Sequence, residues 1–182
     1  MKIIEFPELR QAYNYDCGAS ALQSVLVYYG YQEREDKLLK KLKATRTDIF
    51  DNGVKISEIV KVLKSYNLIV EVKRGLKAED LPQYVDKEIP VIVLLQAWRD
   101  SKSPKSWKTD YVDGHYVVSI GYNNNKIIFE DPSSYWRTFL TFNELDDRWH
   151  AIDDEGKNDP ISVAIIVKGK KKFKANELKH MD

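Results

Sequence analysis

The sequence has very little cysteine: Cys17 is the only one among its 182 residues. A single cysteine excludes an internal disulfide and a cysteine-rich zinc site. Long apolar runs are also missing, since no stretch approaches the roughly 18 consecutive apolar residues that a membrane-spanning helix needs. The N-terminus, MKIIEFPELRQAYNYD, lacks the apolar core of a signal peptide. We therefore expect no direct membrane insertion and a cytoplasmic location.

An excess of charge is likewise missing. A formal net charge of +1 gives no basic surface for nucleic acid, so we expect no nucleic-acid partner. The composition, 43% hydrophobic and 31% charged, is that of an ordinary globular chain, long enough to bury a core without a disulfide or metal. We expect no cofactor and no metal. One domain is expected over residues 1–168, followed by a basic C-terminal tail at 169–182.

Apolar periodicity predicts helices in the first half of the chain and mainly strands in the second. Helices are expected at 18–29, 33–44, 56–66 (capped by Ser57) and 141–149, the last begun by a capping box of Thr141 and Glu144. Strands are expected at 68–73, 91–98, 115–122, 126–131 and 161–167, and a short helix or turn at 76–85. This order predicts an α+β fold in which N-terminal helices pack on an antiparallel sheet.

Cys17 lies at the start of the first expected helix, in the stretch YDCGASALQSVLVYYG. The unpaired N–H groups and the dipole at a helix N-terminus favour a thiolate. Gly18 allows backbone or substrate to approach the sulfur closely. A lone cysteine at a helix start is also compatible with an inert buried side chain, so the choice between the two readings depends on a partner base.

Three histidines are candidates for that base: His115, His150 and His180. His115 opens an expected core strand, whereas His150 follows a helix end and His180 lies in the tail. Asp131, at the end of the neighbouring strand, shares a sheet face with His115 if the loop at 123–125 has three residues. A two-residue loop without a bulge would put the two side chains on opposite faces. Gln11, six residues before Cys17, is placed to join the Cys17 N–H as an oxyanion hole.

The order and spacing of these motifs resemble the bacteriocin-processing cysteine peptidases of the papain clan. The matching motifs are Gln11, Asp16-Cys17-Gly18, Ala21-Leu22, Tyr28-Tyr29-Gly30, Gly114-His115-Tyr116-Val117-Val118 and Asp131-Pro132. This family comprises the double-glycine leader peptidases and their free-standing relatives, and the resemblance covers most of residues 8–145. It implies a papain-like cysteine peptidase fold, with Cys17 as nucleophile, His115 as base, Asp131 as orienting residue and Gln11 as oxyanion donor.

The resemblance also implies a peptide or protein substrate. In well-known members the domain precedes an ABC exporter, but this chain ends soon after the domain. We therefore expect a free-standing member without the ABC transporter, with a separate membrane exporter as a partner. Substrate contacts are expected from Asp16, Gly18, Trp98 and Gly114.

The polar segment 99–114 is an apparent insertion before the histidine. We expect it to be a mobile loop at the rim of the groove, anchored by Trp98 and Trp107. Two classes of function remain open. The first is a thiol enzyme, either a peptidase or an acyl or amine transferase of the same clan. The second is a catalytically silent papain-like module that binds a peptide without cleaving it.

Overall fold

The computed structural model describes residues 1–43, 53–99, 102, 106–178 and 180–181. In this part of the chain the helices are α1 (Cys17–Tyr28), α2 (Glu35–Lys41), α4 (Ile56–Ser65), α5 (Pro82–Asp86) and α6 (Phe142–Arg148), with 3-10 turns at Ala78–Asp80 and Trp107–Thr109. The strands are β1 (Lys2–Ile3), β2 (Ile69–Arg74), β3 (Val91–Gln96), β4 (Gly114–Asn123), β5 (Lys126–Glu130), β6 (Thr138–Thr141), β7 (Ala151–Ile152), β8 (Asn158–Asp159) and β9 (Val163–Lys168).

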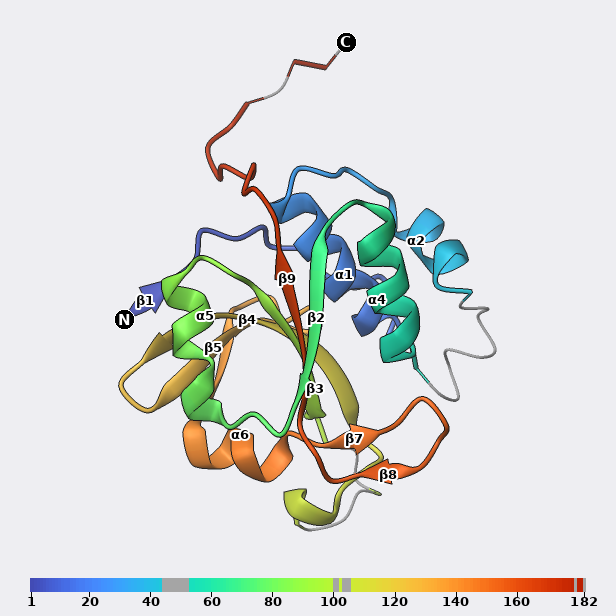
Figure 1. The fold of residues 1–182 in the computed structure, drawn as a ribbon, viewed down its shortest axis with the longest axis vertical. Coiled ribbons are helices and arrows are strands. Elements are labelled where there is room, and N and C mark those ends of the chain that lie inside the picture. Colours follow the sequence, from blue (N-terminus) through green and yellow to red (C-terminus); the bar gives the residue numbers. More distant parts are fainter. Residues whose placement is uncertain (44–52, 100–101, 103–105, 179, 182) are drawn as a thin grey trace.

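An antiparallel sheet runs through the molecule and carries helices on both faces (Figure 1). Its strands follow the order β2-β9-β3-β4-β5-β6, and β1 pairs with β4. Helices α1, α2 and α4 gather on one side of the sheet, as Figure 1 shows, and α6 packs on the other. The short helix α5 contributes to both sides, through Val85 and Tyr84. The predicted α+β arrangement is confirmed. The sequence reading missed the short strands β1, β6, β7 and β8, which carry too few residues for an alternating pattern.

Alternate residues of the central strands divide between two cores. Ile92 and Val118 pack toward α1 and α4, whereas Val93 and Val117 pack toward α6. β3 is therefore buried on both faces, which explains its continuous apolar run. Because β3 and β4 are clamped between the two cores, the residues at their ends are held rigidly.

The connection between β4 and β5 differs from the expected one. Asn123 pairs with Lys126, so the turn has two residues instead of three. A bulge between Ser119 and Gly121 restores the register, because it adds one extra residue to β4. Val118 therefore still pairs with Glu130, and Asp131 continues on the face that His115 occupies.

The start of α4 is capped from another part of the chain. Ser57 is not the cap as predicted: Lys55 holds that position, and its side chain makes no capping bond. Instead the N–H groups of Ile56 and Ser57 donate to the carboxylate of Asp154 at 2.9 and 3.0 Å. Asp154 lies between β7 and β8, so a tertiary contact replaces the local cap. The capping box of Thr141 and Glu144 at α6 is confirmed.

The segment after β9 begins on the surface of the domain. The N–H groups of Lys172 and Phe173 both donate to the Tyr28 carbonyl at 3.1 Å, at the end of α1. The Ala175 N–H donates to the Glu5 carboxylate at 2.8 Å. The first part of the expected basic tail is therefore fixed to α1 and to the N-terminal segment.

Candidate active site

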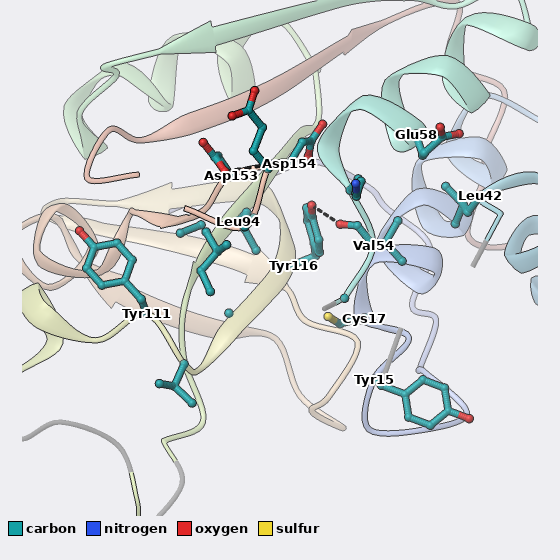
Figure 2. Close-up of a pocket in the computed structure, with 18 of the residues that line it drawn as sticks. Tyr15, Cys17, Leu42, Val54, Glu58, Leu94, Tyr111, Tyr116, Asp153 and Asp154 are labelled. Carbon is teal, nitrogen blue, oxygen red and sulfur yellow. Dashed lines mark hydrogen bonds between the residues drawn. The ribbon is translucent and has the colours of Figure 1, made fainter. Parts of the chain in front are cut away.

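Cys17 lines a cleft of about 820 Å³ between the helices and the sheet. As the first residue of α1, it stands where the helix N–H groups are unpaired. Figure 2 shows the sulfur between Tyr15 and Val54, on the helical side, and Tyr116 of β4 on the sheet side. The Tyr116 hydroxyl donates to the Val54 carbonyl at 2.7 Å and joins the two walls.

His115 and Asp131 form a buried pair beside this cleft. His115 is only 6% exposed, and its Nε2 lies 2.8 Å from Asp131 Oδ1. Asp131 accepts three further hydrogen bonds: from the Ser133 N–H at 2.9 Å, the Thr138 hydroxyl at 3.1 Å and the Trp98 indole at 3.2 Å. Four donors thus fix the carboxylate, and through it the plane of the imidazole.

The electrostatics of the pair favour a charged imidazole. Burial by itself opposes the charge, but hydrogen bonds to Asp131 and Cys17 outweigh it and raise the pKa of His115 to about 9. Burial likewise disfavours the Asp131 carboxylate, yet the hydrogen bonds from His115 and Ser133 hold its pKa below the usual range. Since Nε2 is bonded to Asp131, Nδ1 is the ring nitrogen left for Cys17. The structure thus brings Cys17, His115 and Asp131 together.

Gln11 lies against the segment that carries Asp131. Its N–H donates to the Pro132 carbonyl at 3.0 Å, and its Oε1 accepts from the Ser133 hydroxyl at 2.9 Å. Its Nε2 donates to the Tyr13 carbonyl at 2.7 Å. An amide nitrogen carries two hydrogens, so one donor of Gln11 remains for another acceptor.

Two of the expected substrate contacts hold the backbone around Cys17 instead. Asp16 is fully buried, its carboxylate accepts from the Tyr13 N–H at 3.1 and 3.2 Å, and burial raises its pKa. Gly18 is buried too, and a Cβ there would lie 3.0 Å from both the Tyr116 ring and Val54. Neither residue lines the cleft: the Asp16 carboxylate is directed to Tyr13, and Gly18 packs against Tyr116 and Val54, which do line it.

The other two expected contacts differ from each other. Gly114 lines the cleft, next to His115. Trp98 does not line it: its ring is 59% exposed, and its indole N–H is directed to Asp131. The backbone of Trp98 has a φ of +55°, a strained conformation for a bulky residue. In this backbone conformation the indole N–H of Trp98 reaches Asp131.

Segment 99–114 contributes to the cleft through its last residues. Tyr111 and Val112 line the cleft, and residues 100–101 and 103–105 lie outside the described residues. Trp107 lies between two guanidinium groups, with Arg99 at 3.8 Å and Arg148 of α6 at 4.1 Å from the ring centroid. Trp107 therefore links segment 99–114 to α6, as the expected anchor would. The mobility of the segment stays a prediction.

His150 lies apart from Cys17. Its Nε2 is 2.7 Å from the Asp110 carbonyl, and its ring packs on Tyr111 with centroids 4.7 Å apart. His115, and not His150, is therefore the histidine beside Cys17, and its role as the base stays a prediction. Sequence reasoning missed Ser133 and Thr138, because a short hydroxyl side chain in a turn or strand gives no sequence signal of its own.

Neither a metal cluster nor a membrane-spanning helix is present among the described residues. Among them, no group of three or more His, Cys, Asp or Glu side chains is arranged to hold a metal ion. No described helix combines the length and the apolar character needed to cross a membrane.

Solved structures share this architecture. A double-glycine motif protease from an AMS/PCAT transporter, solved with its leader peptide, superimposes with a TM-score of 0.64 at 17% identity over 93% of this chain and 95% of that one. The peptidase domain of Streptococcus ComA, a bifunctional ABC transporter, gives a TM-score of 0.60 at 22% identity over 92% and 99%. The predicted papain-like cysteine peptidase fold is confirmed.

A curated relative and a family model agree with this fold. The pediocin PA-1 transport/processing ATP-binding protein PedD of Pediococcus acidilactici is 28% identical over 123 residues. That match takes in 68% of this chain but only 14% of PedD, so the chain spans a small part of its relative. The model of the Peptidase_C39 like family matches residues 3–157, and the chain belongs to this family.

Proposed function

We propose that this protein is a cysteine peptidase in which Cys17 attacks the carbonyl carbon of a peptide bond. The observation that carries the proposal is the placement of Cys17, at a helix start and in a cleft, beside the buried His115–Asp131 pair. With the pKa of His115 raised to about 9, imidazolium is the favoured form at neutral pH. A charged imidazole next to the sulfur stabilises the thiolate, which is the nucleophilic form.

The reaction follows from these positions in two halves. The thiolate adds to the carbonyl carbon, and the electron pair of the C=O bond moves to oxygen. Collapse of this tetrahedral intermediate breaks the C–N bond, and His115 gives its proton to the departing amine. His115, now neutral, takes a proton from water, which attacks the thioester and releases the acid. Asp131 keeps the imidazole in one plane and stabilises its charge in both halves.

The oxyanion needs donors at the place where charge develops. We assign this role to the Cys17 N–H, at the start of α1, and to the remaining Nε2 hydrogen of Gln11. Gly114, Tyr111 and Val112 are assigned to the substrate because they line the cleft. Asp16 and Gly18 act indirectly, by holding the backbone on either side of Cys17.

The comparisons suggest a substrate class. PedD is named as a transport and processing protein, and one structural neighbour was solved with a leader peptide. We infer that this chain cleaves a precursor peptide after a double-glycine leader, and that the product is the cargo of an exporter. The reaction is assigned to the cytoplasm, because a catalytic thiol persists in a reducing compartment.

The test is cleavage of synthetic peptides that carry a double-glycine leader, followed by mass spectrometry, with Cys17→Ala as the control. The proposal expects one cut after the second glycine, absent in Cys17→Ala. Binding without any cut would instead favour the silent peptide-binding module. A product joined to an added amine would favour the transferase.

A further inference from the structure

We propose that Ser133 is a positioning residue that sets the orientation of the Gln11 amide for the oxyanion. This assignment rests on the proposed function, since it concerns a residue behind the proposed oxyanion donor. Ser133 is two residues beyond Asp131 and touches both halves of the site. Its N–H donates to Asp131 Oδ1 at 2.9 Å, and its hydroxyl donates to Gln11 Oε1 at 2.9 Å.

A side-chain amide can rotate by half a turn and exchange its oxygen and nitrogen. At Gln11 the two neighbours decide between these orientations. The Ser133 hydroxyl is a donor to the oxygen, and the Tyr13 carbonyl accepts from the nitrogen. In the rotated orientation the Tyr13 carbonyl would face the amide oxygen, and two acceptors would repel each other. Either orientation leaves one N–H uncommitted, but the observed one holds it on the Tyr13 side of the amide, where we place the oxyanion.

The backbone brings Ser133 and Gln11 into register. The Gln11 N–H donates to the Pro132 carbonyl at 3.0 Å, which aligns the two segments side by side. One residue before Gln11 and two before Pro132, the guanidinium of Arg10 pairs with the buried carboxylate of Glu130. Arg10 also donates to the Tyr135 carbonyl at 3.3 Å, beyond Ser133. Contacts on both sides of Ser133 along the chain therefore fix its place relative to Gln11.

The two bonds of Ser133 can be separated by substitution. The bond to Asp131 comes from the backbone N–H and survives any change of the side chain. The bond to Gln11 comes from the hydroxyl and is lost in Ser133→Ala. Because Ser133 is exposed, water competes for this bond, and we expect a moderate effect, smaller than the loss of Gln11 itself.

The experiment compares two reactions of Cys17 in the full chain. Acylation by p-nitrophenyl acetate passes through a tetrahedral oxyanion, whereas alkylation by iodoacetamide does not. The variants are Ser133→Ala, Ser133→Thr, Gln11→Ala and the double variant. Ser134→Ala is the matched control, because the neighbouring Ser134 hydroxyl accepts from the Trp136 N–H and belongs to another contact.

We expect Ser133→Ala to lower the acylation rate about 5- to 10-fold, against roughly 10²-fold for Gln11→Ala. The alkylation rate should stay within about twofold in both, because no oxyanion forms. Ser133→Thr, which keeps the hydroxyl, should restore acylation, and Ser134→Ala should leave it unchanged. On the Gln11→Ala background, Ser133→Ala should have no further effect, since its role runs through Gln11.

Three results would overturn this assignment and leave the proposed function standing. Acylation could be unchanged in Ser133→Ala while it is slow in Gln11→Ala, or alkylation could fall in Ser133→Ala as much as acylation does. The losses of acylation could also add up in the double variant. A parallel fall would mean that Ser133 acts on the Cys17–His115 geometry. Failure of the unsubstituted chain to be acylated, or full acylation in Gln11→Ala, would overturn the proposed function or its oxyanion donor, and this assignment with it.

Discussion

Two histidines of this protein share burial and hydrogen bonding but differ in the group that accepts the bond. His115 is 6% exposed and His150 is 5% exposed. The Nε2 of His115 lies 2.8 Å from the Asp131 carboxylate, and the Nε2 of His150 lies 2.7 Å from the Asp110 carbonyl. A carboxylate carries a full charge and stabilises imidazolium, whereas a backbone carbonyl carries no net charge.

The two histidines also differ in the residues that surround them. His115 has Cys17 on its other side, and the sulfur also helps to raise the pKa of His115. His150 has the ring of Tyr111 beside it, and its own carbonyl accepts from Gln96 at 3.0 Å. His115 is thus arranged to exchange a proton with the cleft, and His150 to hold segment 110–112 against β3. Burial therefore does not identify a catalytic histidine; the acceptor and the group on the other ring nitrogen do.

The largest expected effect comes from exchanging the two histidines for alanine, one at a time. His115→Ala should lower kcat by about 10³-fold or more, because it removes the group that we propose protonates the leaving amine. His150→Ala should keep kcat within a few fold and lower the thermal midpoint, because it removes a buried hydrogen bond. Turnover of a leader peptide and a melting curve measure the two effects. Equal losses of kcat in folded proteins would show that the distinction between the histidines is wrong.

The next effect tests whether the carboxylate is what sets His115 apart. Asp131→Asn should lower kcat about 10-fold, since an amide oxygen still accepts from Nε2 but without the charge. The high-pH limb of the activity profile should also move downward from about pH 9, because the pKa of His115 loses the contribution of Asp131. A limb that stays in place would remove Asp131 from the electrostatics of the site.

The fold and the main side chains of this site were predictable because they depend on local patterns. Cys17 at a helix start and His115 at the start of an apolar strand follow from periodicity alone. Asp131 also met His115 as predicted, but for a different reason. The expected three-residue turn is a two-residue turn plus a bulge in β4, and both give the same register. The bulge lies where β1 pairs with β4, at Gly121, and no local pattern in the sequence reveals this pairing.

What could not be predicted are contacts between distant segments. Asp154 caps α4 from a hairpin far along the chain, and the sequence offered Ser57 as a local substitute. Asp16 looked like a substrate contact because it adjoins Cys17, yet its carboxylate turns back to the Tyr13 N–H. Adjacency in sequence does not fix which way a side chain points when the chain changes direction at that residue.

A third prediction concerns stability and pH. The folded state raises the pKa of His115 from 6.5 to about 9, so it binds the proton more tightly than the unfolded chain. The resulting stabilisation, at most about 3 kcal/mol, is complete below about pH 6.5 and is lost as the pH rises to about 9. Melting curves between these pH values should therefore show a decline in the thermal midpoint. The decline should be weaker in His115→Gln than in the unsubstituted chain; an equal decline in both would assign it to other groups.

The smallest effect comes from the donors around Asp131. Trp98→Phe keeps the ring but removes the indole N–H, one of the four donors to the carboxylate. Trp98 is 59% exposed, so water can replace its indole as a donor to Asp131, and kcat should fall only about 2- to 5-fold, with KM unchanged. Trp107→Phe is the matched control, because Trp107 contacts Arg99 and Arg148 through its ring face and not Asp131. A change in KM alone for Trp98→Phe would instead support the substrate contact expected from the sequence. Trp98 would then act on the substrate and not on Asp131.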